Sequence, residues 1–93
     1  MDENELAEYM SKILVIMNKL EKKEIDEETI DIRGNPKKVL REIGMSKKII
    51  KKYDSDLTCY VTAITFTNNG TFINRYIETD KTVINGSKLK WRR

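Results

Sequence analysis

A single glycine, Gly44, separates two short apolar runs in the middle of the chain and most limits how the chain can fold. Apolar residues at helical spacing lie on both sides of it, namely Val39, Leu40 and Ile43 before and Met45, Ile49 and Ile50 after. Glycine tolerates the positive φ that a tight turn between helices requires. The sequence therefore predicts two short helices that pack on each other across a turn at Gly44.

Polar residues predict where these two helices begin. Asn35 is suited to cap the first helix and Pro36 to occupy its first turn, while Ser46 is suited to cap the second. The outward positions of the second helix are all cationic, namely Lys47, Lys48, Lys51 and Lys52. The second helix is thus predicted to present a basic face to solvent.

This segment, VLREIGMSKKIIKKY at 39–53, resembles the helix-turn-helix superfamily. We assign the motif to residues 36–54. In that superfamily the second helix enters the major groove of DNA, so the resemblance implies base-edge contacts from residues 46–52. The sequence departs from the superfamily at Leu40, where alanine is usual. Residues 46–52 also lack arginine, asparagine and glutamine, which predicts affinity for DNA more readily than base specificity.

The first element is a helix predicted over residues 3–23. Its apolar residues recur at alternating spacings of four and three, namely Leu6, Met10, Ile13, Met17 and Leu20. Such a stripe covers a domain core or forms the seam of a homodimer. Only two heptads are present, which favours the core.

Two strand regions flank the helix pair. Residues 30–33 alternate and predict a short strand after a polar connector at 24–29. Residues 58–78 predict a β-hairpin, because two β-rich runs surround Asn69-Gly70, a strong hairpin-turn signal. A turn at these two residues pairs Phe66 with Ile73 and Ile64 with Arg75.

A second Asn-Gly pair, Asn85-Gly86, predicts a smaller hairpin within C-terminal strands at 82–91. The tail 88–93 carries four bases around Trp91. It is suited either to contact phosphates or to form an edge strand whose lysines oppose aggregation, and the second interpretation is favoured because edge protection is a general need.

The order helix, strand, helix, turn, helix, hairpin is similar to that of a winged helix. We therefore expect one α+β domain over residues 1–93, winged-helix-like, with three helices and a three- to four-stranded antiparallel sheet. The resemblance implies that phosphates are held by basic residues near the motif and on the wing. The nucleic-acid site that it implies comprises Lys37, Lys38, Ser46, Lys47, Lys48, Lys51, Lys52 and Arg75.

Composition argues against an enzyme. The 93 residues contain no histidine and one cysteine, which removes the commonest general base and metal ligand and any intrachain disulfide. Glu27, Glu28 and Asp31 are better explained as a solvated charge cluster than as metal ligands, and Cys59 as a small buried apolar residue. No catalytic, cofactor or metal site is expected. The apolar run at 13–17 is only five residues long, too short to span a membrane, and we expect a cytoplasmic protein.

Charge divides the chain into two parts. Residues 1–32 hold 10 acids and 4 bases, a net charge of −6, whereas residues 33–93 hold 5 acids and 14 bases, a net charge of +9. A basic half favours a nucleic-acid partner, and we expect a small transcriptional regulator that binds double-stranded DNA, dimeric if the first helix forms a seam.

Two alternatives remain from the sequence. One is a phage- or plasmid-encoded inhibitor that binds a host protein or nucleoprotein, for example an anti-CRISPR protein without catalytic activity. The other is an RNA-binding module that stacks bases on Phe72 and Tyr76. The first alternative would use the acidic first helix or the mixed face of the sheet as its working surface.

Overall fold

The computed structural model describes residues 1–55, 59–78 and 83–89, the last range as backbone only. Three helices and four strands follow in the order α1 (Glu3–Glu21), β1 (Glu27–Arg33), α2 (Lys37–Glu42), α3 (Lys47–Tyr53), β2 (Tyr60–Thr67), β3 (Gly70–Ile77) and β4 (Val83–Leu89). The strands form one antiparallel sheet in the order β1-β2-β3-β4. An α+β fold with three helices and an antiparallel sheet is therefore confirmed.

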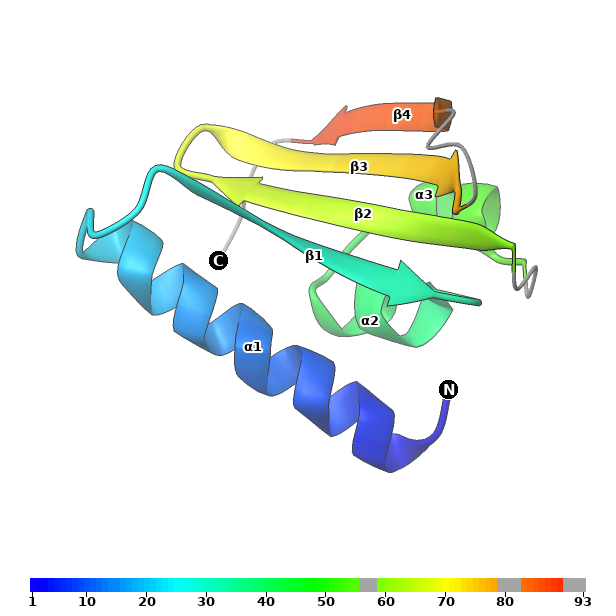
Figure 1. Cartoon of the computed structure of the whole chain (residues 1–93), viewed down its shortest axis with the longest axis horizontal. Helices are drawn as coiled ribbons and strands as arrows, with labels where there is room; N and C mark the ends of the chain where they lie inside the picture. Colours follow the sequence, from blue (N-terminus) through cyan, green and yellow to red (C-terminus); the bar gives the residue numbers. More distant parts are fainter. Residues whose placement is uncertain (56–58, 79–82, 90–93) are drawn as a thin grey trace.

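The core lies between the helices and one face of the sheet (Figure 1). Alternate residues of β2 and β3 face this core, among them Ile64, Phe66 and Ile73, and each is fully buried. α1 contributes Ile13 and Leu20 to the same cluster. The predicted apolar stripe of α1 therefore packs within the chain's own core, as the favoured interpretation requires.

α1 ends two residues earlier than predicted. Lys22 caps it, and Lys23 adopts a left-handed conformation with φ 59°. The backbone N–H of Lys23 donates to Leu20 O at 3.1 Å and that of Glu24 to Lys19 O at 2.9 Å, so carbonyls of the last turn are satisfied. This position usually favours glycine, which explains why the sequence contains no clear stop signal.

β1 is longer than the predicted strand and begins at Glu27, within the segment predicted to be a connector. It pairs along its whole length with β2, from Glu27 opposite Thr67 to Arg33 opposite Val61. β1 lies at the edge of the sheet, and its exposed positions can therefore be polar. Hydrophobic alternation detects only its buried residues, Ile30 and Ile32.

The hairpin of β2 and β3 is confirmed, but its predicted register is wrong. Thr67 pairs with Gly70, so Asn68 and Asn69 form the loop and Ile64 lies opposite Ile73. The Thr67 hydroxyl fixes this turn: it donates to Gly70 O at 2.8 Å and accepts from the N–H groups of Asn69 and Gly70 at 3.1 Å. The shift is two residues, so each side chain keeps its predicted face.

The predicted C-terminal hairpin is wrong. Asn85 and Gly86 lie inside the single strand β4, opposite Arg75 and Asn74 of β3. The register shifts between Arg75 and Tyr76, where β4 contains one additional residue, and bulges of this kind occur at sheet edges. The predicted strand residues 58, 82, 90 and 91, and the tail to residue 93, lie outside the described residues.

Candidate nucleic-acid interface

The turn between α2 and α3 has the geometry that the sequence predicts. Gly44 has φ +83°, and apart from its chain neighbours no described residue has a heavy atom within 4 Å of the position that a Cβ would take. The N–H of Gly44 donates to Arg41 O and that of Met45 to Leu40 O, both at 3.0 Å. Glycine is thus required here by backbone conformation and not by crowding.

Apolar residues on both sides of this turn reach the core. Val39 and Leu40 of α2 and Tyr53 of α3 are fully buried. The Tyr53 hydroxyl donates to Ile73 O of β3 at 3.4 Å, and half-buried Ile43, Met45, Ile49 and Ile50 pack around the same cluster. The outer face of α3 is held in a fixed position because its inner face is packed against the sheet.

A polar contact joins the beginning of α2 to the end of α3. The Asn35 amide donates to Asp54 Oδ1 at 2.8 Å, and Lys37 Nζ lies 3.2 Å from Asp54 Oδ2. The hydrogen bonds from Asn35 and Lys37 lower the pKa of Asp54 below its ordinary value of 3.8. Asn35 also accepts from the Lys37 N–H at 3.0 Å, although Pro36, and not Asn35, occupies the cap position itself. No local sequence pattern indicates Asp54 as the partner of Asn35 and Lys37.

The basic face of α3 is present as predicted. Lys47, Lys48, Lys51 and Lys52 are all exposed, and their spacing places them on the side of the helix opposite Ile50 and Tyr53. The Ser46 hydroxyl accepts from the Ile49 N–H at 3.3 Å, so Ser46 caps the helix as predicted. Among the described residues no carboxylate forms an ion pair with Lys47, Lys48 or Lys51. The ammonium group of Lys52 lies 5.5 Å from the centre of the Tyr53 ring.

Helix stability alone does not explain this lysine pattern. Lys51 and Lys52 lie in the last turn, where cations interact favourably with the helix dipole. Lys47 and Lys48 lie in the first turn, where the dipole disfavours cations, and that turn contains no acidic residue. The chain therefore carries two cations where its own fold opposes them.

The two lysines of α2 have partners within the chain. Lys37 pairs with Asp54, as described, and Lys38 Nζ donates to the backbone oxygen of Met1 at 3.1 Å. Lys37 is half-buried, whereas Lys38 remains exposed. Both residues lie at the start of α2. To bind a phosphate, each would have to give up the contact that it makes within the chain.

Arg75 does not lie on an exposed wing. It is 4% exposed, and its guanidinium donates to Ser55 Oγ at 2.6 Å and to Ser55 O at 3.2 Å. Burial lowers the pKa of its guanidinium, which also lies 5.4 Å from the centre of the Tyr60 ring. The resemblance implied that Arg75 holds a phosphate, and its burial argues against that role, because residue 75 faces the core in the same alternation as Ile73. Arg75 instead holds the segment after α3 against the sheet.

Cys59 and Tyr76 differ in their surroundings from what the sequence predicts. Cys59 is exposed just before β2, which corrects its assignment as a buried apolar residue, because the strand begins only at Tyr60. Tyr76 is half-buried; burial and a hydrogen bond to Asp31 raise the pKa of its phenol. Its hydroxyl is thus engaged within the sheet, which makes it a poorer platform for base stacking.

Comparison of the chain with protein-family models, with curated proteins and with solved structures gives no match. Within the described residues, no group of three or more metal-ligating side chains is close enough to hold a metal ion. No described helix has the length and apolar content needed to cross a bilayer.

Proposed function

We propose that this chain is a small DNA-binding transcriptional regulator of the winged helix-turn-helix type. α3 enters the major groove of double-stranded DNA, and its lysines neutralise phosphates on both sides of the groove. The observation that carries this proposal is the exposed lysine face of α3, including two cations in a first turn that disfavours them.

The surroundings of α3 support this role. Tyr53, the Ser55–Arg75 contact and the Asn35–Asp54 hydrogen bond fix both the packing and the ends of the helix pair. A helix fixed in this way loses little conformational freedom when it binds. We assign Lys47, Lys48, Lys51 and Lys52 to the interface, with Lys38 beside them, and leave Arg75 out of it.

The test replaces Lys47, Lys48 and Lys51 with glutamine in one variant. The matched control replaces Lys12 and Lys19 of α1 and its cap residue Lys22 with glutamine, because it removes the same net charge from a different surface. Affinity for a random-sequence duplex is measured by fluorescence anisotropy over a range of salt concentrations. For about four neutralised phosphates, log affinity should fall against log salt with a slope of about −3.6.

The α3 variant is expected to bind weakly and to lose about 0.9 of that slope for each lysine removed. The α1 control should retain most of both the affinity and the slope. If the two variants lost the same affinity and the same slope, the interaction would depend only on net charge. That result would overturn the assignment of the interface to α3. A slope near zero for the wild-type protein would exclude DNA as the partner.

A protein-binding inhibitor of a host nucleoprotein is the second candidate, and the distribution of acidic residues favours it. Glu3, Glu5 and Glu8 of α1 and Glu27 and Glu28 of β1 are exposed, within a segment whose net charge is −6. Exposed carboxylates of α1 are suited to meet a basic site on a partner. The inhibitor would bind through these carboxylates in the α3 variant as tightly as in the wild type.

A further inference from the structure

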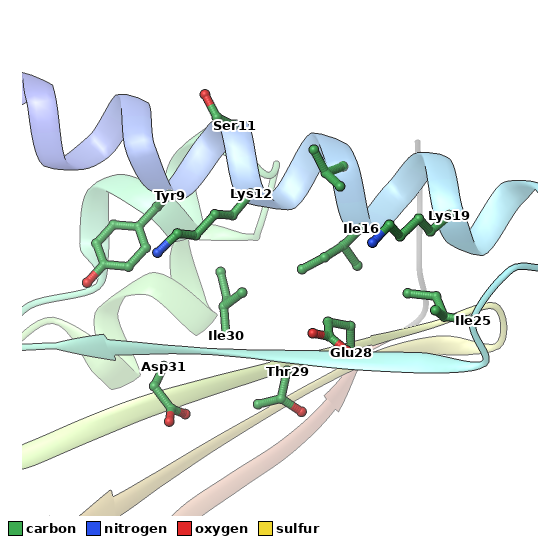
Figure 2. Close-up of a pocket in the computed structure, with 11 residues that line it drawn as sticks. Tyr9, Ser11, Lys12, Ile16, Lys19, Ile25, Glu28, Thr29, Ile30 and Asp31 are labelled. Carbon is green, nitrogen blue, oxygen red and sulfur yellow. The ribbon is translucent and has the colours of Figure 1, made fainter.

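A groove runs between α1 and the outer edge of β1, separate from the lysines of α3. It contains a cavity of about 580 Å³. In Figure 2, Tyr9, Lys12 and Ile16 extend from α1 toward β1, and Glu28 and Ile30 extend from β1 toward α1. Val15 also lines the cavity and is 52% exposed; among the described side chains, it and Leu14 are the large apolar ones most open to solvent. We call this feature the α1–β1 groove.

One wall of the groove is an open strand edge. β1 pairs with β2 on one side, and within the described part of the chain no strand pairs with its other side. In an antiparallel strand, alternate residues direct their N–H and C=O groups away from the paired neighbour. β1 therefore offers a row of backbone donors and acceptors beside a partly apolar cavity. Extended peptides that add a strand to a sheet use this combination, with backbone bonds for affinity and a pocket for specificity.

The charges of β1 determine which strand the edge accepts. Glu27 and Asp31 lie on the sheet face away from α1, and Glu28 lies on the α1 side, where Figure 2 shows it beside Ile30. Arg33, the one base of this strand, already forms an ion pair with Glu78. A second copy of the chain would bring the same carboxylates to this edge, which opposes self-pairing. A basic strand would meet opposite charges instead.

The α1 side of the groove sets a different requirement. Lys12 and Lys19 flank the cavity, and Lys12 Nζ lies 6.0 Å from the centre of the Tyr9 ring. A cationic side chain that entered the cavity would meet these two ammonium groups. Apolar side chains would instead cover Val15 and Ile16, and burial of apolar surface stabilises the complex.

We propose that the α1–β1 groove binds an extended basic segment of a partner protein, which adds to β1 as a fifth strand. Its lysine or arginine residues occupy alternate positions and meet Glu27 and Asp31, four residues apart on one face. Its intervening apolar residues face α1 and fill the cavity beside Val15. This surface is distinct from the lysine face of α3 and does not depend on DNA binding.

The first test uses two labelled peptides with the same apolar pattern. The probe is Lys-Val-Thr-Val-Lys-Val-Thr, and its control replaces both lysines with glutamate. Fluorescence anisotropy with the full chain should show binding of the basic peptide and at least about tenfold weaker binding of the acidic one, since like charges across an interface oppose association. Equal affinities, or no binding of the basic peptide at about 1 mM, would overturn the proposal.

The second test uses two neighbouring residues of α1. Leu14 is 58% exposed and Val15 52%, but only Val15 lines the cavity. Val15→Asp should weaken binding of the basic peptide about tenfold or more by placing a carboxylate where apolar side chains pack, whereas Leu14→Asp should leave the affinity nearly unchanged. Equal effects of the two variants would place the peptide elsewhere and contradict the proposal.

A charge reversal on β1 tests the strand side. Glu27→Lys should weaken binding of the basic peptide about three- to tenfold, while Glu42→Lys on α2 changes the net charge equally and should have little effect. Circular dichroism and duplex binding test whether Val15→Asp still folds. Its spectrum and its duplex affinity are both expected to match those of the wild type. Sedimentation of the wild type and of Val15→Asp tests whether a second copy of the chain occupies the groove instead. A wild-type dimer that Val15→Asp converts to monomers would assign the groove to a second copy and would overturn the proposal of a basic partner segment.

Discussion

α1 and the pair α2–α3 are held against the same sheet by different means. α1 has 19 residues and buries Ile13, Ile16 and Leu20 along one stripe. α2 and α3 have six and seven residues, far fewer than an isolated helix needs for stability in water. They depend on the turn at Gly44 and on the hydrogen bond between Asn35 and Asp54. The long helix is thus specified by its apolar period, and the short ones by individual backbone and polar contacts.

The largest expected effect tests the apolar stripe of α1. Ile13→Asp should lower the free energy of unfolding by about 3–5 kcal/mol, because Ile13 is fully buried and the carboxylate would lack a counter-charge. Leu14→Asp, one position along the same helix, is the control and should cost about 0.5 kcal/mol or less because Leu14 is exposed. Urea denaturation measures both. Similar losses would mean that α1 does not pack through this stripe.

A smaller effect is expected at the turn of the helix pair. Gly44→Val should lower the free energy of unfolding by about 1–3 kcal/mol, the cost of holding a β-branched residue at positive φ. An added Cβ has open space, so the loss is expected to come from backbone conformation and not from crowding at Cβ. Gly44→Asn tests this explanation, because asparagine tolerates the left-handed region and should lose less stability in thermal or urea denaturation. A valine variant as stable as wild type would contradict the requirement for glycine.

Periodic features of the sequence predict much of this fold. The stripe of α1, the Gly44 turn, the Ser46 cap and the hairpin strands are all local patterns, and the structure contains each of them. The hairpin register was predicted wrongly because the Asn-Gly pair does not determine the loop alone. The Thr67 side chain also fixes it through its hydrogen bonds to Gly70. Asn85-Gly86 forms no turn because β3 provides a partner for a continuous strand.

The sequence predicts the candidate site only where the site depends on local patterns. Exposed lysines on α3 follow from helical spacing, which the sequence displays directly. The burial of Arg75 follows from strand alternation, but its partner Ser55 lies 20 residues away in the chain. The contact between Asn35 and Asp54 spans 19 residues. Pairings at such distances depend on how helices and strands meet in space, which no local pattern contains.

The smallest expected effect compares the left-handed residues that follow α1 and α2. Lys23 ends α1 at φ 59° and Gly44 ends α2 at φ 83°, so the chain uses glycine at one helix end and lysine at the other. A residue with a Cβ costs about 1–2 kcal/mol in this region, whereas glycine loses about 0.5–1 kcal/mol more in chain entropy on folding. Lys23→Gly should therefore raise the free energy of unfolding by about 0.5–1 kcal/mol.

Lys22→Gly is the matched control for this change. It removes the same charge from the adjacent exposed position, but Lys22 is right-handed, with φ −80°, and gains nothing from glycine. This variant should lose up to about 1 kcal/mol, so the two substitutions are expected to move the urea midpoint in opposite directions. A loss of stability in both would mean that Lys23 is not left-handed in solution and that α1 ends differently. If only Lys23→Gly raises the free energy of unfolding, then the left-handed position after each helix favours glycine. Of these two helix ends, only that of α2 already has a glycine there.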